Sequence, residues 1–391
     1  MKKHTTTRNT NSTVTHVGLD VHQDSITVAI LAPSATTAEV FRRGTTPANI
    51  AELIRDLKRR APGGLHVCYE AGPTGYGLQR RFAKHSVRCD VIAPSMIPVQ
   101  PGARVKTDPR DAIKLAELLR DGQLAKIVVH PPNEAEEAAR DLCRAREACK
   151  RDQLRTRHRV HKLLLRRSEV YRVGKNWTKQ HRAWLNSIRF DAMTQMVLDD
   201  LLMALDQMAA RLESFNEKIA ALAQEARWQN PAALLRCFRG IDTLSAMGIL
   251  SEAHDIRRFA TAGKFMAYNG LIPSEDTSGP RERRGDIFGG NGHLRRILVE
   301  AAWHYRHPPR IGKALAARRK GQPAQVIARA DRMMHQGKRR FDRLGERGKP
   351  MNKIVCAVAR MLSGALWAIL QQEKQQQQSF PVSIPLQSRK K

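Results

Sequence analysis

Four acidic residues early in the chain have the types and spacing of a metal-binding site. Asp20 and Glu70 each end an apolar run that predicts a strand, and Asp108 and Asp111 lie three positions apart at a predicted helix start. Residues three apart project from one face of a helix, and a lone buried carboxylate is costly without a partner. Mg²⁺ prefers such oxygen ligands. Because two ions about 4 Å apart can activate a nucleophile and stabilise the leaving oxygen of a phosphodiester, the acids predict nucleic-acid chemistry.

Each acid also has a simpler explanation. Asp108 before Pro109 is typical of an N-cap followed by proline at the first helical position. Asp20 could hydrogen-bond a turn at the end of its strand, and Glu70 could pair with Arg80 or the arginine after it. The joint placement, at two strand ends and one helix start, favours a metal site over these separate explanations.

The elements that must position the acids form an alternating pattern from Thr15 to about Gly122. Two apolar runs flank a polar turn, and helical and apolar segments then alternate. This order predicts an α/β sheet and resembles that of RNase H-like nucleases. We expect strands at Val14–Asp20, Ile26–Ala32, Leu65–Glu70 and Cys89–Ala93, and helices at Ala48–Arg60, Tyr76–His85 and Ala112–Leu119.

Strand signals end after Pro131–Pro132. Glu134–Arg167 and Arg182–Glu225 have long helical patterns, which predict a helical hairpin or coiled coil, a usual device for dimerisation. Between Arg144 and Arg167 the first helix is crowded with Arg, Lys and His. Such a face is either solvated or turned toward phosphate, and its single sign of charge favours phosphate.

The remainder of the chain is predicted to be helical except at its end. A compact, glycine-rich segment runs from Pro231 to about Arg310, and a strongly basic stretch runs from Arg318 to Arg347. The Gln-rich end, Gln371–Lys391, has the low complexity of a disordered tail.

The net charge indicates a polyanionic partner. The 391 residues include 68 Lys and Arg against 37 Asp and Glu, a formal net charge of +31. Such a field attracts nucleic acid, whereas no stretch approaches the roughly 20 apolar residues of a membrane span. Met1–Val14 lacks the apolar core of a secretory signal, so we expect a cytoplasmic protein. The six cysteines have no paired zinc spacing and are expected to be reduced thiols.

Three separate blocks resemble a known family. Gly18–His22, Tyr69–Tyr76 and Lys106–Ala112 resemble the three blocks of the Piv-type DEDD insertion-sequence transposases. The resemblance implies an N-terminal domain with the RNase H-like fold of Holliday-junction resolvases. It also implies Mg²⁺, as two ions, held by a catalytic and metal-binding tetrad. Its members are Asp20, Glu70, Asp108 and Asp111.

A later stretch resembles the serine-bearing domain of the same family. The resemblance implies that Ser278 is a covalent nucleophile, whose phosphoseryl link would conserve the bond energy; the hydroxyl is weakly nucleophilic and must be activated. A plain turn is the alternative, because Pro273–Pro280 has a turn composition. Basic residues nearby could neutralise phosphate, and nucleic-acid binding is predicted for Arg281, Arg283, Arg284 and Arg295. The matching blocks are Cys237–Ala246, Phe259, Tyr268–Pro273, Thr277–Gly279, Arg284–Ile287 and Gly290–Leu298.

Two further sets of residues have competing interpretations. Cys237–Ala246 resembles a helix-hairpin-helix, whose glycine-rich turn offers N–H groups to phosphate, but Asp242 stands where a second glycine is usual and would repel phosphate. His16 and His22 flank Asp20, and we prefer strand packing or a surface position to a role as ligand or acid–base group.

These observations predict five parts of the chain. They are an RNase H-like DEDD catalytic domain at 14–125, a helical coiled-coil region at 130–228, a serine-bearing domain at 230–320, a basic helical extension at 321–370 and a low-complexity tail at 371–391. The predicted fold class is therefore α/β followed by α. The predicted function is that of an insertion-sequence transposase or recombinase, which cuts and rejoins DNA with Mg²⁺. The predicted partners are DNA, an element-encoded guide RNA as the family implies, and further copies in a homodimer or homotetramer.

Three other functions stay open on the sequence. A structure-specific endonuclease would use the four acids with water as nucleophile and would need no serine. A non-enzymatic nucleic-acid-binding protein would use the charge alone. An actin-like ATPase is disfavoured, because the glycine-rich phosphate loops are missing.

Overall fold

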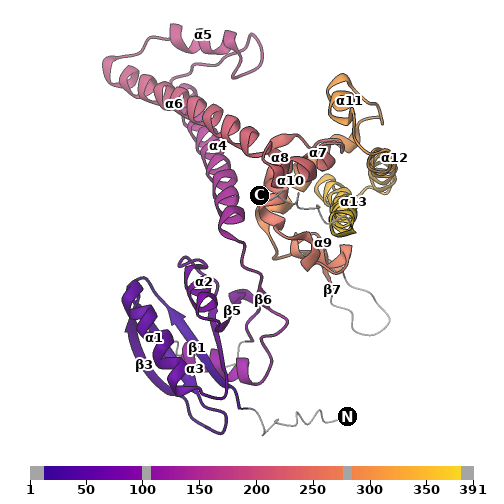
Figure 1. Cartoon of the computed structure of the whole chain (residues 1–391). Coiled ribbons are helices and arrows are strands. Elements are labelled where there is room, and N and C mark those ends of the chain that lie inside the picture. The colour runs from indigo at the N-terminus through magenta and orange to yellow at the C-terminus, as the bar shows by residue number, and fades with distance from the viewer. Residues whose placement is uncertain (1–12, 99–106, 276–283, 380–391) are drawn as a thin grey trace, which may run out of the picture. The chain divides into compact units, whose positions relative to one another are not determined.

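The computed structural model describes residues 13–98, 107–275 and 284–379, which belong to two compact units (Figure 1). The first unit covers Met1–Pro131 and the second covers Pro132–Lys391. The first is a mixed α/β unit, and the second is almost entirely helical. The predicted fold class is thereby confirmed.

A six-stranded mixed sheet forms the centre of the first unit. Its spatial order is β3-β2-β1-β4-β5-β6. The central strands β1, β4 and β5 are parallel to one another. Strand β2 pairs antiparallel with β1, β3 pairs antiparallel with β2, and β6 pairs antiparallel with β5. The bounds are β1 Thr15–Val21, β2 Ser25–Leu31, β3 Glu39–Gly44, β4 Leu65–Glu70, β5 Arg88–Ile92 and β6 Val128–Val129.

Helices cover both faces of this sheet, because its central strands carry apolar side chains on both sides. Helices α1 (Pro47–Arg60) and α2 (Gly77–Lys84) pack on the face that holds Val17 and Leu19 of β1. Helix α3 (Asp108–Arg120) packs on the other face, where Cys68 of β4 is fully buried. Because side chains alternate along a strand, the buried strand residues pack either beneath α1 and α2 or beneath α3.

Gly18 allows α3 to lie directly on β1. A Cβ atom at this position would lie 2.1 Å from the carbonyl oxygen of Ala112 and 2.6 Å from the amide nitrogen of Ala116. Both atoms belong to the backbone of α3, so no side-chain rotation could relieve the overlap. Close approach of one backbone to another is a use that only glycine serves, and here it sets the position of the N-terminus of α3 over the sheet.

Two long paired helices and a short one form the first part of the second unit. Helices α4 (Glu134–Arg166) and α6 (Ala192–Leu222) lie side by side, and the segment between them contains α5 (Lys179–Ser187) (Figure 1). The prediction of one continuous helix over Arg182–Glu225 is wrong. The backbone leaves the helix after α5, and the side chain of Asp191 then caps α6 by accepting a 3.0 Å hydrogen bond from the amide of Thr194.

Seven further helices are described in the rest of the second unit, and six of them, α7–α10, α12 and α13, pack around one large apolar core. The last of them, α13, contacts α7, α9, α10 and α12. The bounds are α7 Ala226–Leu235, α8 Thr243–Ala253, α9 Ala262–Tyr268, α10 Gly292–Ala302, α11 Lys313–Arg319, α12 Ala324–Glu346 and α13 Met351–Ser379.

A buried carboxylate joins α4, α8 and the start of α10. Glu252 of α8 is 2% exposed and accepts hydrogen bonds of 2.6 and 2.9 Å from Arg144 of α4. It also accepts one of 2.7 Å from the amide group of Asn291, the N-cap of α10. Burial acts to raise the pKa of this carboxyl, but the hydrogen bonds from Arg144 and Asn291 hold the pKa below its usual value.

Three local predictions are wrong. The strands β3 and β6 are not predicted at all, and the second unit contains a small antiparallel sheet of β7 (Pro273–Glu275) and β8 (Arg284–Ile287) where no strand is expected. These strands are short or polar and lack an alternating apolar pattern. The Gln-rich end is not irregular from Gln371 onward, because α13 continues to Ser379.

Helix α13 is long and apolar enough over Met351–Gln372 to cross a membrane by length and composition, a stretch that the sequence analysis does not identify. Half of its apolar window is buried inside the unit. Val358, Leu362 and Leu366 are fully buried in the core shared with the other helices. We therefore treat α13 as a core helix.

Candidate metal centre

The ends of β1 and β4 bring two of the predicted acids to one place. Leu19 of β1 is the register partner of Tyr69 of β4, and the strands are parallel. Asp20 and Glu70 therefore occupy the next position on each strand. Leu19 and Tyr69 point into the core beneath α1 and α2, so the alternation of strand side chains puts the two acids on the opposite face, which α3 covers.

Helix α3 brings the other two acids to this face through its first turn. The helix begins at Asp108, and both Asp108 and Asp111 lie in that turn. Its N-cap is Thr107, whose side chain makes no capping hydrogen bond. The interpretation of Asp108 as an ordinary N-cap is therefore wrong. Acidic side chains in a first turn interact favourably with the helix dipole, which stabilises the start of α3.

Asp20, Asp108 and His22 form the tightest group. One possible ligand atom from each lies within 4.8 Å of the others. The Nε2 atom of His22 lies 3.3 Å from Oδ2 of Asp20 and 3.5 Å from Oδ1 of Asp108. This three-residue group does not include Glu70 or Asp111, although Asp111 is close enough to influence Asp20 electrostatically.

The electrostatics of Asp20 indicate a crowded anionic site. Burial raises the pKa of its carboxyl, and the negative charges of Asp108 and Asp111 raise it further, whereas His22 acts in the opposite direction. Repulsion of this kind between carboxylates is relieved either by a proton or by a cation.

Two residues of this site escape prediction from sequence. His22 is exposed, as one of the two expectations has it, but its contacts with two of the acids are not expected. Arg42 of β3 donates a 2.8 Å hydrogen bond to Oδ2 of Asp108 across 66 positions of sequence. The spacing of His22 from Asp20 is a weak signal that could have found it, but nothing in the sequence indicates Arg42.

The residues present fit a divalent cation. Asp20 and Asp108 supply carboxylate oxygens, the ligands preferred by Mg²⁺, and His22 supplies one nitrogen within the same 4.8 Å. Burial first, and then the charges of Asp108 and Asp111, raise the pKa of Asp20, and a cation would offset both effects. Glu70, on the same face of the next strand, is placed to complete the set.

The serine predicted as nucleophile lies outside the described residues, as do Arg281 and Arg283. Ser278 belongs to the segment between β7 and β8, whose register partners include Glu275 and Arg284. Arg284 begins β8. Arg295 of α10 is engaged within the protein, since its Nη1 donates to the carbonyl oxygens of Gly289 at 2.6 Å and Gly270 at 3.4 Å.

The turn that resembles a helix-hairpin-helix is stabilised by Asp242. Its carboxylate caps α8 by accepting a 2.8 Å hydrogen bond from the amide of Ser245, and the Ser245 hydroxyl accepts one from the amide of Asp242. Burial acts to raise the pKa of Asp242, but the bonds from Ser245 hold the pKa below its usual value. Gly240 has φ +81° and would clash with α10 if it carried a Cβ. Asp242 thus has a structural role as a cap in the position where a second glycine is usual.

Comparisons with known proteins agree with this architecture. The family model described as "Transposase IS116/IS110/IS902 family" matches residues 232–316, and the DEDD transposase model named for IS110 matches residues 17–167. A Sinorhizobium fredii protein named as a transposase, y4qE, is 37% identical over 92% of this chain and 89% of its own length. The transposase for insertion sequence element IS1533 of Leptospira borgpetersenii is 34% identical over 86% of this chain and 99% of its own. The DEDD model spans β1, β4 and α3, which carry the four acids, and the chain belongs to the IS116/IS110/IS902 family of insertion-sequence transposases.

Proposed function

We propose that this transposase cuts and rejoins DNA at a magnesium centre formed by Asp20, Glu70, Asp108 and Asp111, with Ser278 as the covalent nucleophile. One observation carries the proposal: Asp20, near the end of β1, and Asp108, at the start of α3, have possible ligand atoms within 4.8 Å of each other. Glu70 and Asp111 lie on the neighbouring strand and helical turn of the same face. The close approach of Asp20 and Asp108, with Glu70 and Asp111 at adjacent positions, supports a centre where a phosphodiester could be bound.

Two balanced steps describe the proposed chemistry. The Ser278 oxygen attacks phosphorus, one P–O bond of the strand breaks, and the serine proton passes to the departing sugar oxygen. The hydroxyl of the incoming strand then attacks the phosphoserine, and a proton returns to the serine oxygen. Mg²⁺, when bound, would polarise the phosphodiester oxygens and lower the pKa of an attached hydroxyl or water.

The residues of the chain have separate tasks in this scheme. Asp20 and Asp108 would hold the cation, and Nε2 of His22 lies 3.3 and 3.5 Å from their carboxylate oxygens. Arg42 neutralises one oxygen of Asp108 from the edge of the sheet. The carboxylates belong to the first unit and Ser278 belongs to the second. In this scheme, the carboxylates and the serine that act on one phosphodiester come either from the same chain or from two different copies.

Two partners belong to the same proposal. The paired helices α4 and α6 carry exposed apolar side chains, with Met193, Met196 and Met203 76%, 61% and 55% exposed, which supports self-association into a homodimer or homotetramer. The net charge of +31 supports a second polyanion besides DNA, for which the family implies an element-encoded guide RNA.

The test is a suicide-substrate assay with purified full-length protein, element-end DNA, its upstream transcript and Mg²⁺. We expect protein–DNA adducts with the unaltered protein and none with Ser278→Ala or Asp20→Ala. Asp24→Ala and Ser274→Ala are matched controls, because Asp24 is an exposed acid near Asp20 and Ser274 lies in β7 near the serine segment. Both controls should retain the adduct. Cleavage without adduct that survives Ser278→Ala would replace the serine mechanism by a water-using nuclease.

A further inference from the structure

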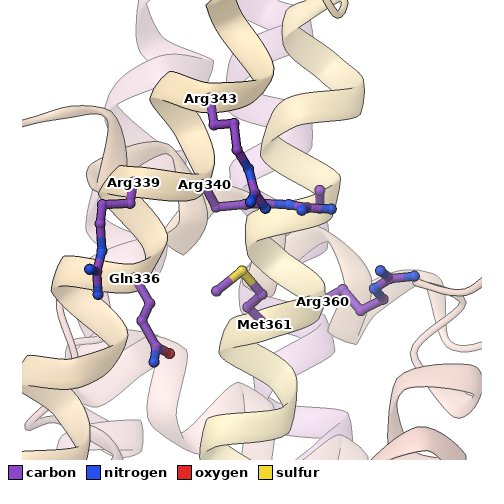
Figure 2. A pocket seen from close by; sticks show the side chains of 7 residues that line it. Gln336, Arg339, Arg340, Arg343, Arg360 and Met361 are labelled. Atoms are coloured by element: carbon purple, nitrogen blue, oxygen red, sulfur yellow. The ribbon is translucent and has the colours of Figure 1, made fainter. Parts of the chain in front are cut away.

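A groove between α12 and α13 is lined by a cluster of arginines (Figure 2). Arg339, Arg340 and Arg343 come from α12 and Arg360 from α13. In Figure 2 the side chain of Arg340 reaches from α12 toward α13, and that of Arg343 descends beside it. Met361 forms part of the floor.

The cluster continues along α12 as a stripe. A second hollow on the same two helices is lined by Arg329, Arg332 and Gln336. At about 100° per residue, the positions from Arg329 to Arg343 that line the two hollows fall within roughly 60° of one line along the helix. With a rise of about 1.5 Å per residue, the stripe is about 21 Å long.

Counter-charges are missing from this stripe. Among the described residues, no ion pair or hydrogen bond involves the side chains of Arg329, Arg332, Arg339, Arg340, Arg343 or Arg360. Of the three acids of α12, Asp331 pairs with Arg319 and Asp342 with Lys338, and both lie more than about 100° from the centre line of the stripe. The third acid, Glu346, is exposed beyond the last arginine of the stripe and makes no ion pair among the described residues.

Burial and neighbouring arginines both affect the pKa of Arg340. Partial burial lowers the pKa of its guanidinium, and repulsion by Arg343, Arg360 and Arg347 lowers it further. Guanidinium groups held together without acids cost free energy in the isolated protein. That cost is recovered when an anion binds between them, because charge-assisted hydrogen bonds to phosphate are strong.

The shape of the groove favours duplex DNA among polyanions. Its lining is arginine, glutamine, methionine, alanine and glycine, with no aromatic side chain among the residues that form it. Single strands are bound by stacking bases on aromatic rings, whereas the duplex backbone is bound by cations alone. Duplex DNA carries one phosphate charge per about 1.7 Å of its axis, so a stripe of about 21 Å is long enough to meet several phosphates.

We propose that the α12–α13 arginine groove is a second DNA site, which binds the phosphate backbone of duplex DNA without reading its sequence. In the sequence, the groove residues lie beyond residues 232–316, which the family model matches, and they include none of the four carboxylates and not Ser278. The inference depends on DNA as the partner of this transposase, but it requires neither the metal centre nor the serine.

The experiment measures binding of a labelled 30-base-pair duplex of arbitrary sequence by fluorescence anisotropy, in EDTA and from 50 to 200 mM salt. EDTA removes Mg²⁺, so a failure of the proposed catalysis would leave the result unchanged. Each phosphate contact contributes about 0.9 to the slope of log affinity against log salt. The variant with Arg339, Arg340, Arg343 and Arg360 changed to glutamine should therefore lower the slope by about 3.6.

Two control proteins separate the groove from net charge. A charge-matched variant replaces Lys175, Lys179, Arg211 and Lys218, which are exposed cations of the α4–α6 region, by glutamine; it should change the slope by less than about one. If the fourfold groove variant fails to fold, Arg340→Gln alone should lower the slope by about one.

The outcomes that overturn the proposal are specific. Equal losses in the groove variant and the charge-matched variant would reduce the effect to net charge. An unchanged slope for duplex DNA would refute the site, and a loss confined to an RNA duplex of the same length would assign the groove to RNA. If the groove variant binds DNA normally but loses binding to polyglutamate, the groove would be assigned to an acidic protein.

Discussion

Replacing Gly18 by alanine should disturb the candidate metal centre without touching any of its acids. The new Cβ would lie 2.1 Å from the Ala112 oxygen, 2.6 Å from the Ala116 nitrogen and 2.9 Å from the Leu115 Cβ. Overpacking of a core costs about 1–3 kcal/mol. Because two of these three contacts are with helix backbone, we expect a cost near the upper end, about 3 kcal/mol.

The loss of stability in Gly18→Ala can be measured for the first unit alone within the full-length protein. The first unit spans Met1–Pro131, and a domain of that size loses about 3–4 °C in melting temperature per kcal/mol. We therefore expect a decrease of about 10 °C. All five tryptophans lie in the second unit, so their fluorescence follows that unit, whereas far-ultraviolet circular dichroism follows both. They are Trp177, Trp184, Trp228, Trp303 and Trp367.

The expected pattern is an early circular-dichroism transition with an unchanged tryptophan transition. If the variant instead accommodates the methyl group by lifting α3, Asp108 and Asp111 move away from Asp20, and Mg²⁺ affinity measured by calorimetry should fall. Gly77→Ala is the matched control, because a Cβ at Gly77 meets no atom within 4 Å. Melting within 1 °C of the unaltered protein, together with unchanged Mg²⁺ binding, would refute the argument that Gly18 sets the position of α3.

Two further predictions concern the second unit. Glu252→Gln leaves the half-buried Arg144 without its anion and should cost about 2 kcal/mol, measured by tryptophan fluorescence in urea; a cost below about 1 kcal/mol would contradict it. Because the pKa of Glu252 is lower in the folded state, its contribution to stability is complete above the unfolded pKa of about 4.3 and is lost as the pH falls through the folded pKa; Glu252→Gln should lack this component. Met196→Glu with Met203→Glu adds charge to exposed apolar positions and should shift the protein toward monomer by light scattering, whereas Met351→Glu, at an exposed methionine elsewhere, should not. An unchanged mass for the first double variant would exclude this surface as the interface.

The strand-borne half of the site was accessible from sequence because side chains alternate along a strand. An apolar run that ends in an acid predicts both the strand and the face of its last residue, and two such runs in parallel neighbours bring their ends together. The pairing of Leu19 with Tyr69 shows this for Asp20 and Glu70. The position of α3 depends on Gly18, which leaves room for the helix backbone. The sequence alone does not reveal this role, because it depends on which helix packs against Gly18.

The remaining groups were hidden because they depend on weakly patterned elements. Strand β3 has the sequence Glu-Val-Phe-Arg-Arg-Gly at the edge of the sheet and is mostly exposed or half-buried. Its hydrogen bonds to β2 hold it in place, and backbone pairing leaves little trace in side-chain types. Arg42 therefore reaches Asp108 through an element that hydrophobic periodicity could not detect.

The role of Asp108 depends on whether helix α3 begins at Asp108 or one residue later, which composition alone does not determine. Thr107-Asp108-Pro109 suits a helix whose N-cap is either of the first two residues, since threonine and aspartate are both good N-caps. If Asp108 were the cap, its carboxylate would fold back onto the amides of the first turn. Because the helix begins at Asp108 and Thr107 takes the cap position, the carboxylate instead contacts His22 and Arg42. Pro109 is compatible with either start, so the tertiary contacts with β1 and β3 decide whether this acid stabilises a helix or serves a metal centre.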